Sequence, residues 1–207
     1  RHEMLAPAAA ALALRLPIAH IEGGDISEGA IDDAVRNALT KMSHLHFTPT
    51  AQARRRVLAM GEESWRVTHV GAPSIDHLLP SNIPDLASVQ KVLGQPLSRN
   101  ACVVATHPVT LHEDTTDEAE VLFEALKAFP EQIVFCFPNA DAGYTHLVNR
   151  ARHLCNEHPN ARLYVNLDHL SYWGLIQNAG MLVGNSSSGI METASVGLPT
   201  VDIGTRQ

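Results

Sequence analysis

The sequence has few aromatic residues, few cysteines and no long apolar run. Aromatic residues make up 5% of its 207 residues, and its cysteines are Cys102, Cys136 and Cys155. Because these are odd in number and widely spaced, and two lie in apolar segments, we expect free thiols in a reducing compartment, with neither a disulfide nor a zinc site. No apolar stretch approaches the ~20 residues needed to span a bilayer. We therefore expect no membrane partner and a cytoplasmic location.

Positive charge is also scarce. The chain has 15 lysines and arginines against 22 aspartates and glutamates, a formal net charge of -7. Nucleic-acid-binding proteins present basic stripes to the phosphate backbone, and none is found here, so we expect no nucleic-acid partner. The basic run at residues 54–56 lies in a helical pattern and is interpreted as a solvated helix face. With 45% apolar residues, the chain can fill one large core or two smaller ones.

Short apolar runs alternate with longer amphipathic stretches along the whole chain, a pattern typical of repeated βα units. The expected strands cover residues 17–21, 45–48, 67–70, 102–106, 133–137, 163–166, 181–183 and 200–203. The expected helices cover residues 31–42, 50–60, 86–93, 117–129, 145–156, 168–178 and 188–196. Thr50 and Asp168 are placed as capping residues.

This alternation predicts an α/β fold, with parallel sheets wrapped by helices and active groups at the carboxyl ends of the strands. The pattern weakens between Pro80 and Asn100, where proline and polar residues gather, so we expect two domains. Residues 1–80 form the first, residues 81–98 a linking region around one helix, and residues 99–207 the second. The chain starts inside a helix-like run and stops just after a strand, so we expect both ends to be cut from a longer enzyme.

The strongest local signal is the turn after the expected strand at residues 181–183. It reads Gly184-Asn185-Ser186-Ser187-Ser188-Gly189 and leads into a helix. Backbone N–H groups at a helix start, small side chains and serine hydroxyls suit phosphate oxygens, which makes Ser186, Ser187, Ser188 and Gly189 candidate ligands. An ordinary serine cap with a glycine for close packing is the alternative. Glu192, one turn into the helix, either accepts hydrogen bonds from a ribose diol or faces solvent.

A second cluster follows the first expected strand. Glu22 lies at the carboxyl end of that strand and precedes two glycines, while Asp32 and Arg36 share a helix face at i and i+4. Two carboxylates and a cation beside one crevice can divide acid and base roles, because different environments separate their pKa values. The alternative is an Asp32 cap with an exposed Asp32–Arg36 ion pair.

Two further residues end expected strands. His107 follows residues 102–106 and precedes a proline, where it can act as a general acid or phosphate donor. Asn139 follows the next strand, where it either reads a base or caps a turn. His44 and His46 alternate along a strand without a carboxylate or cysteine at ligand spacing, so we expect no metal there.

Taken together, these stretches resemble the UDP-N-acetylglucosamine 2-epimerase family, specifically its hydrolysing branch. The matching pieces are Arg1-His2-Glu3-Met4-Leu5, His20-Ile21-Glu22-Gly23-Gly24, Gly29-Ala30-Ile31-Asp32-Asp33, Thr40-Lys41-Met42-Ser43-His44-Leu45-His46, Thr106-His107-Pro108-Val109-Thr110, Phe137-Pro138-Asn139, Gly184-Asn185-Ser186-Ser187-Ser188-Gly189 and Gly204-Thr205-Arg206-Gln207. They occur in order over the whole chain.

The resemblance implies two Rossmann-like domains of the glycosyltransferase-B type, with catalytic acids on the first, which is incomplete, and the nucleotide on the second. It implies that Glu22 and Asp32 are catalytic carboxylates supported by Arg36. The residues that it implies hold UDP are His107, Asn139, Ser186, Ser187, Glu192 and Arg206. It implies a UDP-sugar substrate, no cofactor and a homo-oligomer, dimeric or tetrameric, at full length.

The implied reaction removes the C2 proton of UDP-N-acetylglucosamine while the C1–O bond to UDP breaks. Water then adds to the glycal and gives free N-acetylmannosamine. The family places another catalytic aspartate immediately before the position of Arg1, and further elements beyond both ends, so we expect the 207-residue chain alone to be inactive.

Several alternatives remain open. One is the non-hydrolysing branch, which keeps the nucleotide on the sugar, although we expect Gly23-Gly24 after Glu22, with Asp32-Asp33, to mark hydrolysis instead. Another is a 2,4-diacetamido UDP-sugar as substrate. A third is a glycosyltransferase or a nucleotide-sugar binding module, which the two acids Glu22 and Asp32 make less suitable.

Overall fold

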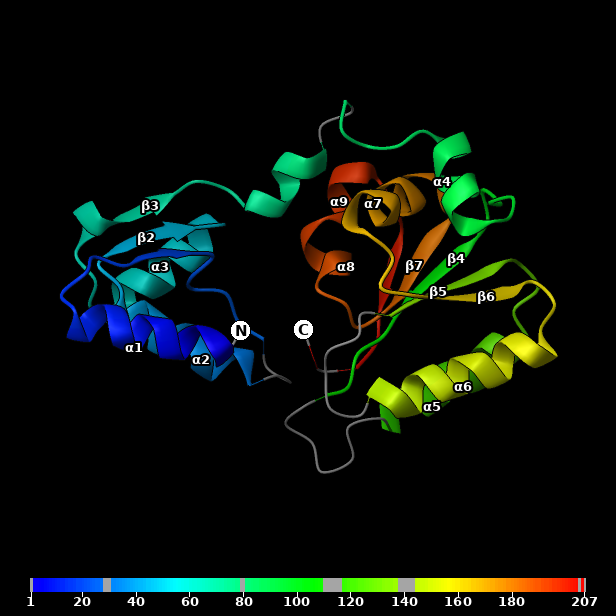
Figure 1. Cartoon of the computed structure of the whole chain (residues 1–207), viewed down its shortest axis with the longest axis horizontal. Helices are drawn as coiled ribbons and strands as arrows, with labels where there is room; N and C mark the ends of the chain where they lie inside the picture. Colours follow the sequence, from blue (N-terminus) through cyan, green and yellow to red (C-terminus); the bar gives the residue numbers. More distant parts are fainter. Residues whose placement is uncertain are drawn as a thin grey trace. The chain divides into compact units, whose positions relative to one another are not determined.

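The structure is a computed structural model that describes residues 2–27, 31–78, 81–109, 117–137, 144–204 and 206. The chain divides into two compact units, Arg1–Asp76 and His77–Gln207. Each unit is built on a parallel sheet with helices packed beside it (Figure 1). The predicted α/β class with two parallel sheets is therefore confirmed.

The first unit contains a 3-stranded parallel sheet in the order β1-β2-β3. Its elements are η1 (His2–Met4), α1 (Leu5–Ala13), β1 (Ala19–Ile21), α2 (Asp32–Met42), β2 (Leu45–Thr48), α3 (Ala51–Ala59), η2 (Ser64–Arg66) and β3 (Val67–His69). The hydroxyl of Thr50 caps α3 by accepting a hydrogen bond from the backbone N–H of Ala53 at 2.9 Å, as its sequence position predicts. Fully buried Ala53 and Val57 face inward from this helix.

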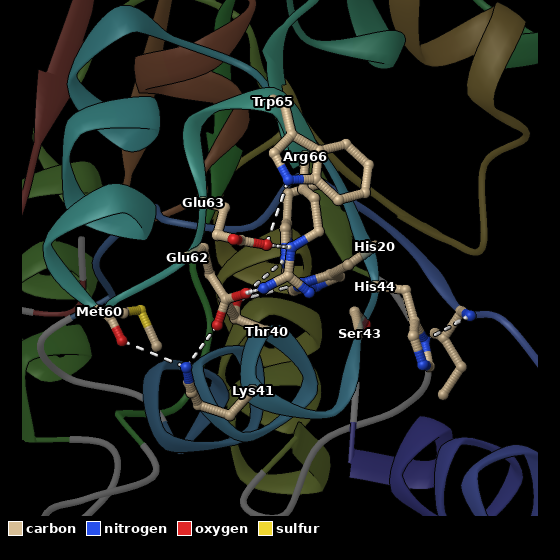
Figure 2. A network of polar contacts seen from close by, with 12 residues as sticks. His20, Thr40, Lys41, Ser43, His44, Met60, Glu62, Glu63, Trp65 and Arg66 are labelled. Atoms are coloured by element: carbon tan, nitrogen blue, oxygen red, sulfur yellow. Dashed lines mark hydrogen bonds and ion pairs between the residues drawn. The ribbon is translucent and has the colours of Figure 1, made fainter. Parts of the chain in front are cut away.

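The interior of the first unit holds a polar network around Glu62 (Figure 2). The side chain of Glu62 is 4% exposed, forms ion pairs with Lys41 and with Arg66 at 3.1 Å, and is hydrogen-bonded to Nε2 of His46 at 3.3 Å. The hydrogen bond from Lys41 is the main reason why the pKa of Glu62 lies below its ordinary value. Removing a carboxylate from water is costly unless cations compensate it, and Lys41 and Arg66 do so here.

The second unit contains a 5-stranded parallel sheet in the order β6-β5-β4-β7-β8. Its elements are α4 (Leu86–Leu93), β4 (Cys102–Ala105), α5 (Asp117–Lys127), β5 (Ile133–Phe137), α6 (Tyr144–Glu157), β6 (Ala161–Val165), α7 (His169–Asn178), β7 (Met181–Gly184), α8 (Ser188–Met191), α9 (Thr193–Val196) and β8 (Thr200–Asp202). The 3-10 helix η3 (Pro73–Leu78) leads into this unit. Asp168 caps α7, as predicted, by accepting a hydrogen bond from Ser171 N–H at 3.0 Å.

The strand order of the second sheet reverses between β4 and β7. From β4 the chain adds β5 and β6 on one side, then returns to add β7 and β8 on the other. In an open parallel sheet, the crevice outside the carboxyl ends of the strands at such a switch point is the usual place for a ligand. The ends of β4 and β7 are therefore the expected place for a ligand in this unit.

Helices cover both faces of this sheet (Figure 1). One core cluster joins α5 and α6 to alternate strand residues such as Cys102 and Val104, and the other joins α4 and α7 to Val103 and Ala105. This alternation is the period of two expected of a strand buried on both sides. Residues 81–98 contribute buried Val89, Leu93 and Leu97 to the second cluster.

The elements agree closely with the sequence pattern. Every expected strand is present, and its ends differ by at most two residues. The clearest difference is the helix expected at residues 188–196, which is split into α8 and α9 at Glu192. Within the described part of the chain, every helix is too short or too polar to cross a membrane.

Candidate functional site

In the first unit, the predicted carboxylates and arginine gather around one small cavity at the end of β1. It has a volume of about 170 Å³. Its lining residues are His20, Ile21, Glu22, Asp32, Val35, Arg36 and Leu39. The structure therefore brings Glu22, Asp32 and Arg36 together, which spacing along the sequence suggests but does not ensure.

Glu22 adopts a strained backbone conformation directly after β1. Its φ is +64°, in the left-handed region that costs a non-glycine residue about 1–2 kcal/mol. Its backbone N–H is fixed by a hydrogen bond to the carbonyl of Phe47 at 2.9 Å. Two residues after Glu22, Gly24 has a φ of +89°, and a Cβ there would lie 2.4 Å from the carbonyl oxygen of Ala53. The chain thus turns sharply against α3 and leaves the Glu22 side chain in the cavity.

The surroundings of Glu22 raise its pKa. Burial is the largest cause and the nearby carboxyl of Asp25 adds to it, whereas the cation of Arg36 acts in the opposite direction. A carboxyl whose pKa is raised toward neutral pH exchanges protons more readily under physiological conditions, which suits general acid or base work.

Arg36 organises the loop that follows Glu22. Its guanidinium donates hydrogen bonds to the carbonyl of Asp25 at 3.0 Å and to the hydroxyl of Ser27 at 3.3 Å. Its ion pair is with Asp33, at 4.0 Å, rather than with Asp32. Asp32 is the first residue of α2, whose N-cap is Ile31 without a side-chain cap bond. The alternative of an Asp32 cap with an Asp32–Arg36 pair is therefore wrong.

In the second unit, the side chain of Asn185 ties the ends of β4 and β7 together at the switch point. Its carbonyl oxygen accepts a hydrogen bond from His107 N–H at 2.6 Å, and its amide donates to the carbonyl of His107 at 2.9 Å. Gly184 makes this approach possible, because its φ is +143° and a Cβ would lie 2.1 Å from the carbonyl oxygen of Ala105. His107 is therefore held beside the turn at residues 184–189, called the serine turn below.

A cavity of about 380 Å³ lies at the same end of the second sheet. Its lining residues are Ala105, His107, Cys136, Phe137, Asn166, Leu167, His169, Tyr172, Ser186 and Ser188. Hydroxyls connect across it: Tyr172 Oη lies 2.7 Å from Ser188 Oγ, and Ser188 Oγ lies 3.1 Å from Ser186 Oγ. The volume and this mixture of apolar wall and polar groups suit a small ligand with polar groups.

The serine turn leads into two short helices rather than one long helix. Glu192, between α8 and α9, has a φ of -117°, while the hydroxyl of Thr193 donates to the carbonyl of Gly189 at 2.7 Å. The favourable field of a helix N-terminus is therefore smaller than for the single helix expected, and hydroxyls and local N–H groups have a larger share. The guanidinium of Arg206 donates to the carbonyl of Asn185 at 3.0 Å.

The whole chain also matches a known protein family. The family model described as UDP-N-acetylglucosamine 2-epimerase matches residues 1–207. The chain belongs to the UDP-N-acetylglucosamine 2-epimerase family.

Two relatives in this epimerase family show how far the match extends. The chain is 34% identical to a protein of Legionella pneumophila named UDP-N,N'-diacetylbacillosamine 2-epimerase (hydrolyzing), over 100% of this chain and 55% of that protein. It is also 34% identical to a protein of Neisseria meningitidis named UDP-N-acetylglucosamine 2-epimerase, over 100% of this chain and 54% of that protein. The chain thus spans about half the length of these relatives.

A solved epimerase structure has the same fold. It is the crystal structure of UDP-GlcNAc 2-epimerase from Neisseria meningitidis bound to UDP-GlcNAc, with a TM-score of 0.75 and 18% identity over 94% of this chain and 55% of that chain. At this identity the likeness concerns the fold alone, and it agrees with the glycosyltransferase-B type predicted from the sequence.

Only some of the residues predicted to bind UDP line the cavity of the second unit. His107, Ser186 and Ser188 line the cavity of about 380 Å³, whereas Ser187, Gly189, Glu192 and Arg206 are not among its described lining residues. Asn139 lies outside the described residues. Within the described residues, no group of three or more His, Cys, Asp or Glu side chains is arranged to hold a metal ion.

Several residues that line the two cavities of this epimerase-family chain were not predicted from the sequence. They are His20 in the first unit and Asn166, His169 and Tyr172 in the second. His20 lies in β1, only two residues before Glu22, and this short spacing in the sequence is a usable signal. The others come from the loop after β6 and from α7, whose approach to the serine turn is a tertiary contact without a local sequence signal.

Proposed function

We propose that this sequence forms the central part of a hydrolysing UDP-N-acetylglucosamine 2-epimerase. The first unit is the remainder of an N-terminal Rossmann-like domain that carries the catalytic carboxylates, and the second is the greater part of a C-terminal domain that binds UDP. The observation that carries this proposal is the cavity lined together by Glu22, Asp32 and Arg36, in a chain whose family is established.

The proposed chemistry uses the first unit at carbon C2 of the sugar. One carboxylate of the pair Glu22 and Asp32 removes the C2 proton as the C1–O bond to UDP breaks, and the other returns a proton when water adds to the glycal. The raised pKa of Glu22 supports a proton-exchanging role, which typically contributes ~10² to 10⁴ in rate. Arg36 holds Asp25 and Ser27 in the loop that follows Glu22.

The second unit is proposed to hold the nucleotide. His107, fixed through its backbone by Asn185, is assigned to the diphosphate, where it stabilises or protonates the departing oxygen. The serine turn supplies hydroxyl and N–H donors to phosphate oxygens. Asn139, Ser187, Glu192 and Arg206 remain proposed UDP contacts on the basis of the family resemblance.

A second candidate substrate is a UDP-sugar with two acetamido groups. It is favoured by the relative in Legionella pneumophila, whose name specifies UDP-N,N'-diacetylbacillosamine and hydrolysis. The same carboxylate chemistry applies at C2 of that sugar, so the choice concerns specificity rather than mechanism. A non-hydrolysing outcome, in which UDP stays on the epimerised sugar, is the remaining alternative.

The direct test uses the complete protein that carries this sequence. It is incubated separately with UDP-N-acetylglucosamine and with UDP-N,N'-diacetylbacillosamine, and products are identified by NMR. Release of UDP with free N-acetylmannosamine supports the first proposal, and exclusive turnover of the diacetamido sugar supports the second. A UDP-linked epimer, or no turnover of either sugar, contradicts hydrolysis as proposed.

A further inference from the structure

His20 is a lining residue of the carboxylate cavity that the mechanism above does not use. It lies in the middle of β1, directly opposite His46 of β2 in the parallel register. Its ring nitrogen Nδ1 is 3.2 Å from the hydroxyl oxygen of Thr40 (Figure 2). Thr40 belongs to α2, the helix that also carries Asp32 and Arg36. The contact with Thr40 thus fixes the orientation of the imidazole ring of His20 beside the cavity.

The hydrogen bonds of Thr40 determine which nitrogen of His20 carries the proton. The Thr40 hydroxyl donates its proton to the backbone carbonyl of Arg36 at 2.9 Å. A hydroxyl has a single proton, and a carbonyl oxygen can only accept. The Thr40 oxygen must therefore accept the hydrogen bond from His20 Nδ1–H. In the neutral ring this leaves Nε2 without a proton and with its lone pair available.

The packing around this contact keeps it in place. The side chain of Thr40 is fully buried. A Cβ at Gly23 would lie 2.9 Å from Nδ1 of His20 and 3.2 Å from the hydroxyl oxygen of Thr40. Any residue larger than glycine at this position would press between the two groups, so the first glycine after Glu22 serves the His20–Thr40 contact.

The electrostatic surroundings keep the His20 ring neutral. Burial, followed by the neighbouring His46 and Arg36, lowers the pKa of His20 to about 4. His46 offers no proton to His20 from its Nδ1, which is buried and has no partner among the described residues, while its Nε2 is bound to Glu62. Near neutral pH, His20 therefore presents a hydrogen-bond acceptor rather than a cation.

We propose that His20 is a positioning residue for Glu22: its unprotonated Nε2 accepts a hydrogen bond from the proton-bearing form of the Glu22 carboxyl. Both side chains line the same small cavity, and a protonated carboxyl has one O–H that needs an acceptor. The charged groups that also act on Glu22 are Asp25 and Arg36. This role deepens the proposed function, on which its catalytic consequence rests, whereas the tautomer of His20 and the proposed hydrogen bond with Glu22 do not depend on it.

The first experiment measures the tautomer in the 207-residue chain by long-range ¹H–¹⁵N NMR of the histidine rings. We expect His20 at pH 7 to be neutral with its proton on Nδ1. Thr40→Val removes the acceptor with little change of shape and is expected to mix the two tautomers, while Thr40→Ser keeps the hydroxyl and the wild-type spectrum. An Nε2–H tautomer or a protonated ring in the wild type would overturn the proposal.

The second experiment follows the Glu22 carboxyl by ¹³C NMR titration in the wild type and in His20→Asn. Asparagine can still donate to Thr40 but has no group at the place of Nε2. Loss of the acceptor should lower the pKa of Glu22 by up to about one unit, the effect of one net hydrogen bond. An unchanged Glu22 titration in a folded His20→Asn chain would contradict the proposal. If this variant fails to fold, the same titration in Thr40→Val decides.

A kinetic arm separates this inference from the proposed function. In the complete protein, His20→Asn should reduce kcat on UDP-N-acetylglucosamine by about tenfold, with a smaller change in KM, and move the Glu22 limb of the pH profile to lower pH. Thr40→Ser should behave as the wild type. A wild type without turnover refutes the proposed function and leaves the NMR results to judge His20, whereas an active protein with an unchanged His20→Asn profile refutes the role of His20.

Discussion

Asn185 offers the sharpest test of how the second unit is held together at its switch point. Its side chain is the link between the backbone of His107 and the serine turn, with hydrogen bonds of 2.6 and 2.9 Å, and the residue is 3% exposed. Asn185→Ala leaves the N–H and the carbonyl of His107 without these partners. A buried polar group that loses its partner costs about 1–3 kcal/mol.

We expect Asn185→Ala to lower the free energy of unfolding of the second unit by about 2–4 kcal/mol, because His107 is only half-buried and water can reach part of the vacated site. Trp173 reports on this unit, since it is 6% exposed, whereas Trp65 of the first unit is 73% exposed. Urea unfolding followed by Trp173 fluorescence in a Trp65→Phe background gives the measurement.

Asn178→Ala is the matched control for Asn185→Ala. The Asn178 amide donates one hydrogen bond of 2.8 Å to the carbonyl of Gly174 within α7. Losing it should cost about 0.5–1.5 kcal/mol, the net value of a single hydrogen bond. If Asn185→Ala is no more destabilising than Asn178→Ala, the argument that Asn185 joins β4 to β7 is refuted.

Three further predictions concern the first unit. Gly24→Ala should destabilise this unit by more than about 2 kcal/mol in urea unfolding, because the new Cβ would lie 2.4 Å from the carbonyl oxygen of Ala53. Gly61 has a similar φ and no atom within 4 Å of a new Cβ, so Gly61→Ala should cost only about 1 kcal/mol. Glu62→Gln should lower the free energy of unfolding at pH 7, and by less as the solution becomes more acidic. The pKa of Glu62 is lowered in the folded state, so the stabilisation by its carboxylate is complete above the unfolded-state pKa and is lost as pH falls through the folded-state pKa. Thermal unfolding at several pH values checks this convergence. Glu22→Gln should reduce kcat of the complete protein by ~10² to 10⁴ while UDP affinity, measured by calorimetry, stays near the wild-type value.

Each of these has a result that would count against it. Equal effects of Gly24→Ala and Gly61→Ala would show that contact with α3 does not require glycine. A pH-independent difference between Glu62→Gln and the wild type would show that the carboxylate is not stabilised by its cationic neighbours. A Glu22→Gln protein with full kcat would remove Glu22 from the reaction.

The fold was largely predictable because its signals are local. Strands such as β4 and β5 are short apolar runs buried on both faces, and helices such as α3 and α7 start at capping side chains that the sequence displays. The break at Glu192 was not predictable in the same way. It accompanies the bond of Thr193 to Thr200 at 2.9 Å, a contact with β8 that depends on tertiary packing.

The candidate site was predictable in its residue types and less so in its contacts. Glu22 and Asp32 were found because acids and glycines follow a strand, and the cavity indeed contains both. The partner of Arg36 was missed because the loop after β1 folds back and offers the carbonyl of Asp25. The role of Asn185 was missed because its partner His107 is distant in sequence and becomes a neighbour only through the pairing of β4 with β7.

We propose above that the carboxylate cavity around Glu22 serves C2 proton abstraction with loss of UDP. The most direct measurement incubates the complete protein with UDP-N-acetylglucosamine in D₂O and follows the products by NMR. We expect UDP and free N-acetylmannosamine in equal amounts, with deuterium at C2 of the sugar, in the wild type, and product formation slowed by ~10² to 10⁴ in Glu22→Gln. A product still linked to UDP, or free N-acetylmannosamine without deuterium at C2, would contradict it.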